Sequence, residues 1–195
     1  MLPLWFKLVY TVLALGIVVI YWVRYGPGNL LWFCDLALIG LIAGLWLESS
    51  LLISTLALSV LVPELVWNLV FFARVIFRVR IAGVIDYMFE PERPALLKAL
   101  SLFHVPLPFI LVWAVWTLGY DPRALLAATA MAWIVLPLTW LLTPPERNVN
   151  WVHGPGGEKV RQQRVHPLLF VAFLMLALPI VFYLPAHFAL YRLVG

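Results

Sequence analysis

Long runs of apolar residues, separated by short polar or Gly/Pro-containing breaks, fill almost the whole chain. A membrane-spanning helix needs about 20 consecutive, mostly apolar residues. Six runs approach this length, and they predict helices over about residues 4–23, 29–47, 51–77, 99–118, 124–142 and 167–191. We therefore expect an all-α, polytopic membrane protein in which residues 1–195 form a single six-helix transmembrane bundle.

Composition strengthens this prediction and excludes a soluble domain. Apolar residues make up 65% of the chain and charged residues only 11%, whereas a soluble domain carries about 25% charged residues. The ten Trp and seven Tyr are typical of a protein with many anchors at the membrane interface. Only Lys7 precedes the first apolar run, and no small-residue cleavage site follows it, so we expect a retained first helix rather than a signal peptide.

The basic residues predict an orientation. Ten of the thirteen lie at the connections between predicted helices 1 and 2, 3 and 4, and 5 and 6. Because basic loops stay in the cytoplasm, these connections are predicted to be cytoplasmic and both termini to lie outside. The ten are Arg24, Arg74, Arg78, Arg80, Arg93, Lys98, Arg147, Lys159, Arg161 and Arg164. Basic residues beside apolar spans indicate contact with anionic lipids, so we expect membrane lipids as partners and no nucleic acid.

Two of the cytoplasmic connections are longer than simple turns. Residues 81–97 mix apolar and acidic side chains, which is compatible with an interfacial amphipathic segment. Residues 146–165 are rich in Gly and Asn and are therefore predicted to form a loop. This loop would either fold over the mouth of the bundle as a lid or remain a solvated connection.

Five polar or reactive residues fall inside the predicted spans: Cys34, Asp35, Glu64, Asn68 and His104. Charged side chains at membrane depth are costly and usually mark function or a structural pair. From the rise of about 1.5 Å per helical residue, Glu64 lies near its span centre and the others roughly 5–9 Å toward the cytoplasm. The five residues lie on the helices predicted over 29–47, 51–77 and 99–118. Short connections make these three helices neighbours, so the sequence predicts an inward-facing cluster.

A structural role is the alternative for each of these residues. Cys34 would be a packing residue, and Asp35 and Glu64 would be partners of Arg74 or His104. As the only cysteine, Cys34 cannot form an intrachain disulfide.

The remaining polar groups have equally plain structural interpretations. Asn68 would join helices through its amide, and His104 would bond a backbone carbonyl that Pro106 or Pro108 leaves free.

The histidines do not indicate a metal. His153 and His166 share the predicted cytoplasmic side with His104, but their spacing matches no metal motif. His187 lies near the outer end of the last helix and is read as interfacial. We expect no metal and no cofactor.

A thiol and an imidazole at one depth suggest nucleophilic catalysis. His104 would take the proton of Cys34, and the thiolate would attack an acyl carbonyl. Asp35 or Glu64 would orient the imidazole and stabilise its cation. The substrate would be a lipid ester, with Asn68, Arg74 and Asn150 as candidate substrate-binding residues. Arg78 and Arg80 are further candidates for holding a lipid phosphate.

The stretch Leu30-Leu31-Trp32-Phe33-Cys34-Asp35-Leu36-Ala37-Leu38 resembles the second-helix motif of YwaF-like integral membrane proteins. That group includes transmembrane phospholipid acyltransferases and is similar in layout to the androgen-induced-gene type of fatty-ester hydrolases. The resemblance implies six spans, a nucleophile on helix 2 and a His on helix 4, here Cys34 and His104. Asn148-Val149-Asn150-Trp151 resembles the group's Asn-aromatic motif before the last span. The chain also looks like bacterial inner-membrane proteins, which implies that location.

Two other classes of function stay open on the sequence. Asp35, Glu64 and His104 would also suit the proton relay of a small-solute transporter or channel, although no inverted repeat is visible. Alternatively, the buried carboxylates would pair with partner helices in a structural subunit of a larger membrane complex. A homo-oligomer is compatible with all three interpretations, and whether the chain is an enzyme stays undecided at this point.

Overall fold

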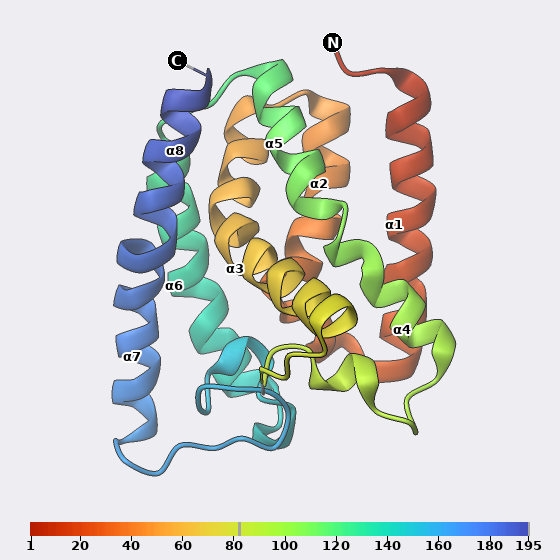
Figure 1. Ribbon diagram of the computed structural model, residues 1–195. Coiled ribbons are helices and arrows are strands. Elements are labelled where there is room, and N and C mark those ends of the chain that lie inside the picture. The colour runs from red at the N-terminus through yellow and green to blue at the C-terminus, as the bar shows by residue number, and fades with distance from the viewer. Residues whose placement is uncertain (82, 195) are drawn as a thin grey trace.

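A computed structural model describes residues 1–81 and 83–194, and helices are the regular elements throughout this part of the chain, with no strand among them (Figure 1). The longer helices are α1 (Leu4–Tyr25), α2 (Phe33–Leu47), α3 (Ser50–Phe77), α4 (Ala95–Ser101), α5 (Leu107–Leu118), α6 (Ala124–Leu142), α7 (Pro167–Ala177) and α8 (Leu184–Val194). Short helical segments connect them: η1 (Pro27–Leu31), η2 (Asp86–Phe89), η3 (Leu102–His104), η4 (Pro145–Arg147), η5 (Val149–Trp151) and the π-helical η6 (Leu178–Tyr183).

Five helical stretches of the described chain are long and apolar enough to cross a membrane. They are Leu4–Tyr25, Ser50–Phe77, Ala95–Leu118, Ala124–Leu142 and Pro167–Val194. The prediction over residues 29–47 differs, because this region divides into η1 and α2 around the extended residue Trp32 (φ −57°, ψ 136°). At 15 residues, α2 rises only about 22 Å, which is less than the roughly 30 Å of a hydrocarbon core.

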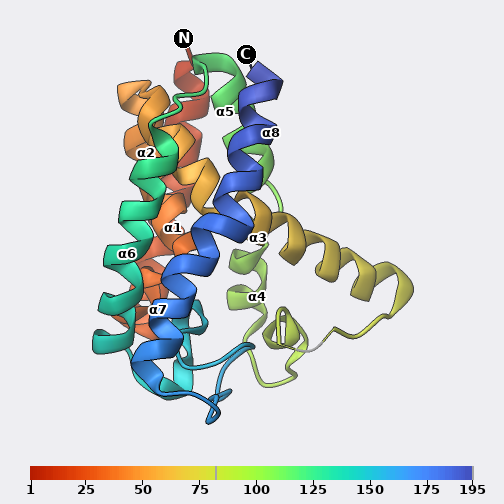
Figure 2. The same ribbon diagram turned by 90° about the vertical axis from the view of Figure 1, so that its left-hand side faces the viewer.

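Helix α3 is the centre of the bundle. It packs against α2, α5, α6 and η6 (Figure 1), and its first half is almost entirely buried, with Ile53, Leu58 and Val60 in the core. Pro63 lies inside the helix and removes one backbone hydrogen bond, which permits a bend. Beyond this point α3 leans away from the other helices (Figure 2).

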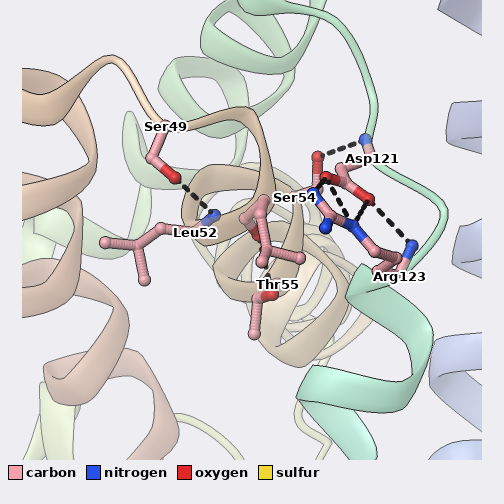
Figure 3. Close-up of polar contacts among 7 residues, drawn as sticks. Ser49, Leu52, Ser54, Thr55, Asp121 and Arg123 are labelled. Carbon is pink, nitrogen blue, oxygen red and sulfur yellow. Dashed lines mark hydrogen bonds and ion pairs between the residues drawn. The ribbon is translucent and has the colours of Figure 1, made fainter.

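Polar contacts fix the beginning of α3 to the connection between α5 and α6 (Figure 3). The Ser49 side chain caps the helix by accepting a hydrogen bond from the Leu52 amide, and Ser54 Oγ accepts one from the Asp121 amide. Arg123 pairs with Asp121 at 2.7 Å, and this hydrogen-bonded cation holds the pKa of the Asp121 carboxyl below its ordinary value. This contact orients the start of α6 on α3.

An ion pair secures the first helix to the same end of the bundle. Lys7 Nζ lies 2.6 Å from Glu48 Oε1, and the Leu2 amide donates to the same oxygen. Glu48 ends α2 in a left-handed conformation (φ 47°). We call this end, where both chain termini lie, the terminal end (Figure 1).

Two long connections, residues 78–94 without residue 82 and residues 143–166, lie at the opposite end, which we call the loop end (Figures 1 and 2). Arg93 joins them, because it donates to Glu158 and to the Tyr25 hydroxyl. Gly83 (φ 89°) packs so closely on the second connection that a Cβ there would lie 3.1 Å from the Gly156 Cα. The two connections therefore form one folded layer across the loop end.

The outer surface is apolar in α1 and α7, where only Tyr10, Ala14, Tyr21 and Val171 of the apolar side chains are buried. A soluble protein rarely exposes apolar patches of this extent. The chain is thus built as an integral membrane protein, as its composition predicts.

Close packing of α2 on α3 gives a test of the fold. A Cβ on Gly44 would lie 2.8 Å from Ile53 Cγ1, whereas a Cβ on Gly16 would meet open space. Because Ile53 is fully buried, we expect Gly44→Ala to destabilise the protein by about 1–3 kcal/mol through overpacking. Gly16→Ala is the matched control and should leave the Tm in detergent unchanged or raise it slightly. Equal Tm values for the two variants would contradict this packing.

Candidate functional site

The structure gathers three of the predicted catalytic residues into one cluster. Cys34 lies in the first turn of α2, Glu64 in α3 and His104 at the end of η3. One side-chain atom from each lies within 4.8 Å of the others. Side chains separated by up to 70 positions in the sequence thus come together inside the bundle.

The imidazole of His104 is held in a defined orientation. Its Nδ1 lies 2.9 Å from both carboxylate oxygens of Glu64, and Glu64 is only 3% exposed. The rings of Phe103 and Trp67 stack on the imidazole at centroid distances of 4.1 and 4.7 Å. A proton on Nδ1 that is directed at the carboxylate leaves the lone pair of Nε2 for a second partner.

Prolines explain why His104 stands at a break between helices. In a continuous helix the His104 carbonyl would accept from residue 108, but Pro108 has no N–H group. Asn68 takes its place, since its Nδ2 donates to the carbonyl oxygens of His104 at 2.8 Å and Glu64 at 2.9 Å. Asn68 therefore joins α3 to η3 beside the cluster, and its buried Oδ1 makes no protein hydrogen bond.

Asp35 lies next to the cluster but has a different partner. It is 2% exposed, and its Oδ2 accepts a hydrogen bond from Asn29 Nδ2 at 3.0 Å. As the adjacent residue on a helix, it points about 100° away from Cys34. Of the two candidate carboxylates, Glu64 is the one that contacts the imidazole.

Asn150 anchors the loop that the sequence predicts between α6 and α7 onto the start of α2. Its Oδ1 accepts from the Phe33 amide at 3.0 Å, and its Nδ2 donates to the Leu31 carbonyl at 2.7 Å. The residue adopts a left-handed backbone (φ 51°), which Asn tolerates better than most residues. Asn150 thus contacts the residue immediately before Cys34, although it is far from it in sequence.

Asn148 organises the rest of that loop. Its Nδ2 donates to the carbonyl oxygens of Gly154, Gly156 and Gly157, and its Oδ1 accepts from the His153 amide. The two asparagines that the sequence marks as a motif therefore use their side chains to hydrogen-bond the backbone of a folded loop and of the start of α2.

Arg74 lies at a different place. It reaches Asp86 at 3.9 Å and stacks over Phe89 at 4.5 Å, while Arg80 reaches the same Asp86 oxygen at 3.6 Å. These arginines hold η2 against the end of α3. Arg78 ends that helix in a left-handed conformation (φ 57°).

A cavity of about 210 Å³ opens at the loop end beside the start of α2. Its lining residues come from α1, η1 and the two connections: Tyr25, Asn29, Trp32, Arg93, Arg147, Val149 and Glu158. The sequence marks Arg93 and Arg147 as orientation signals and as contacts for anionic lipids, and it does not place them in a cavity. The one local signal for the cavity was the Gly-Pro-Gly-Asn turn of residues 26–29, which brings Asn29 back toward α2.

The cluster of Cys34, Glu64 and His104 also has the chemistry of a metal site. Thiolate, imidazole and carboxylate are ligands that Zn²⁺ accepts, and their atoms need to move little to surround one ion. His153, in contrast, lies in the loop-end layer, and His187 bonds Tyr120 at 2.6 Å at the terminal end.

Comparisons with protein-family models, with curated proteins and with solved structures find no match to this chain.

His153 makes the folded loop sensitive to pH. Its burial and the positive charge of Arg161 lower its pKa from the ordinary 6.5, with Glu146 opposing, and its Nε2 is buried without a protein partner. Folding favours the neutral ring, so the loop is fully stable above pH 6.5 and loses stability as the pH falls toward the lowered pKa.

We therefore expect amide hydrogen exchange in residues 148–160 to accelerate below pH 6.5, relative to a His153→Gln variant that cannot titrate. Mass spectrometry of the exchanged protein at several pH values measures this difference. Helix α6 provides the internal control for intrinsic exchange rates. The same acceleration in both proteins would rule out His153 as the titrating group.

Proposed function

We propose that this protein is a membrane-embedded acyl-lipid hydrolase or acyltransferase with Cys34 as its nucleophile. The observation that carries the proposal is the cluster of Cys34, His104 and the buried Glu64, in which the carboxylate pairs with Nδ1 of the imidazole. A nucleophile, a base and a group that orients the base are the three parts of an activated-nucleophile site. The resemblance to YwaF-like proteins, itself a proposal, implies the same nucleophile and base.

The reaction follows from these roles. Nε2 of His104 removes the Sγ proton of Cys34, and the thiolate attacks the ester carbonyl to form a C–S bond. The C–O bond of the ester then breaks, and the imidazolium returns its proton to the departing alkoxide. Water or a second alcohol next attacks the thioester with His104 as base, which releases the acyl group and restores the thiol. Glu64, whose carboxyl group contacts Nδ1, orients the ring and stabilises the imidazolium.

The thiol of Cys34 depends on His104 for its activation. The carboxylates of Asp35 and Glu64 lie close to Cys34, which is in the first turn of α2, and negative charge beside a thiol disfavours the thiolate, so the imidazole has to take the proton as the thiol reacts. The surrounding helices expose long apolar surfaces to lipid, so a lipid ester is the substrate that the setting favours.

Labelling by an acyl electrophile that carries a long alkyl chain tests the proposal. We expect Cys34 to be acylated in the purified wild-type protein and not in Cys34→Ser. His104→Ala and Glu64→Gln should slow acylation by about 100-fold or more, because base and orientation are lost. His187→Ala, which removes a histidine at the terminal end, is the matched control and should label like wild type. Equal rates in all histidine variants would refute catalysis by this cluster.

A metal centre is the second candidate function for the same three residues, favoured by the convergence of three different ligand types. Elemental analysis of the same preparations separates the two. One Zn²⁺ per chain that is lost in Cys34→Ser would make the thiol a ligand rather than a nucleophile.

We also propose that the chain crosses the bacterial cytoplasmic membrane six times, with α2 and η1 together as the short second span and both termini outside. The concentration of basic residues at the loop end supports this orientation. A C-terminal alkaline phosphatase fusion should then be active and a C-terminal green fluorescent protein fusion dark. The same reporters inserted after Lys159, in the loop-end layer, should give the opposite result. A fluorescent C-terminal fusion would show that the C-terminus is cytoplasmic and that the proposed orientation is wrong.

A further inference from the structure

The lining of the cavity at the loop end holds more positive than negative side chains. The cavity is lined by two guanidinium groups, Arg93 and Arg147, and one carboxylate, Glu158. Arg93 uses its charge within the protein, because it pairs with Glu158 at 3.1 Å and Glu90 at 3.2 Å. Its guanidinium also stacks over Tyr87 at 5.1 Å.

Arg147 is in a different situation. It donates to the backbone carbonyl of Tyr25, and the ion pairs formed by the described residues do not include it. Its side chain therefore brings to the cavity a positive charge that forms no ion pair with the described carboxylates, while Glu158 is paired with Arg93. Asn29 adds amide hydrogen-bond donors, and Trp32 adds an apolar wall.

The cavity adjoins the proposed catalytic cluster. Asn29, which lines it, donates to Asp35 on the first turn of α2. Trp32, which also lines the cavity, is the residue before α2 and lies two positions before Cys34. Val149, another lining residue, precedes Asn150, which accepts a hydrogen bond from the Phe33 amide. A ligand in the cavity would thus lie beside the N-terminal end of α2, whose first turn holds Cys34.

We propose that this cavity binds the phosphate of the substrate, with Arg147 as the principal cation. The inference rests on the proposed acyl transfer at Cys34 and names its substrate class as a phosphate-bearing acyl ester. In a glycerophospholipid the acyl ester is separated from the phosphate by the glycerol unit alone. A phosphate held at Arg147 would therefore place an ester carbonyl toward Cys34 and leave the acyl chain in the apolar bundle.

Binding is best measured without turnover, in a Cys34→Ala protein that has been freed of lipid in detergent. Native mass spectrometry with short-chain phosphatidylglycerol and with diacylglycerol of the same chains reports the contribution of the phosphate. We expect the phospholipid to bind at least 10-fold more tightly. sn-Glycerol 3-phosphate as competitor separates a lipid from a soluble ligand: weak competition identifies the lipid, and full competition identifies a soluble phosphate ester in the same cavity.

Variants locate the site. Arg147→Gln in the Cys34→Ala background should weaken phospholipid binding about 10-fold, and Arg147→Lys should restore part of it. Arg164→Gln removes an exposed arginine of the same connection and should leave binding unchanged. If Arg147→Gln lowers the Tm so far that binding cannot be measured, the comparison of phospholipid with diacylglycerol decides alone.

Equal affinity for phospholipid and diacylglycerol, or unchanged binding in a folded Arg147→Gln protein, would overturn the headgroup site. Because these titrations involve no chemistry at Cys34, they succeed or fail independently of acyl labelling.

Discussion

The contact between Glu64 and His104 is the constraint around which the interior of this bundle is arranged. A carboxylate that is only 3% exposed among apolar helices is costly unless a hydrogen-bonded partner stabilises it. The imidazole meets both oxygens at 2.9 Å, and aromatic rings from α3 and η3 hold it there. Removal of either partner would leave the other polar group buried and unsatisfied, which is the more costly state.

The irregular backbone around this pair serves the same purpose. Helix-breaking residues are tolerated in membrane helices when side chains satisfy the backbone groups that they release. Pro108 leaves the His104 carbonyl without its helical partner, and Asn68 of the neighbouring helix α3 donates a hydrogen bond to it instead. The break lets His104 leave the regular path of α4 and α5 and face α3. The residue that pairs the helices structurally is thus also the residue that positions the candidate base.

At the loop end, as at Asn68, asparagine side chains hold the backbone through hydrogen bonds. Asn150 holds the start of α2, and Asn148 folds the glycine-rich segment that follows. Together with Arg93 they convert two long connections into a layer over the cavity beside the start of α2. The candidate catalytic cluster and the proposed phosphate site therefore share one structural support, and changes in this layer should affect both.

The long apolar runs by themselves determined the helical class, the membrane setting and most helix boundaries, because about 20 apolar residues in succession have few other stable arrangements. The prediction of one helix over residues 29–47 was wrong in detail, since the extended Trp32 between η1 and α2 has no strong sequence signal. Sequence also marked Cys34, Glu64 and His104, because charged and reactive groups stand out in apolar runs. Only the tertiary structure decided that Glu64 rather than Asp35 meets the imidazole, that Arg74 turns to Asp86, and that Arg147 lines a cavity. Those outcomes depend on helix rotation and on contacts between residues far apart in sequence, which no local pattern encodes.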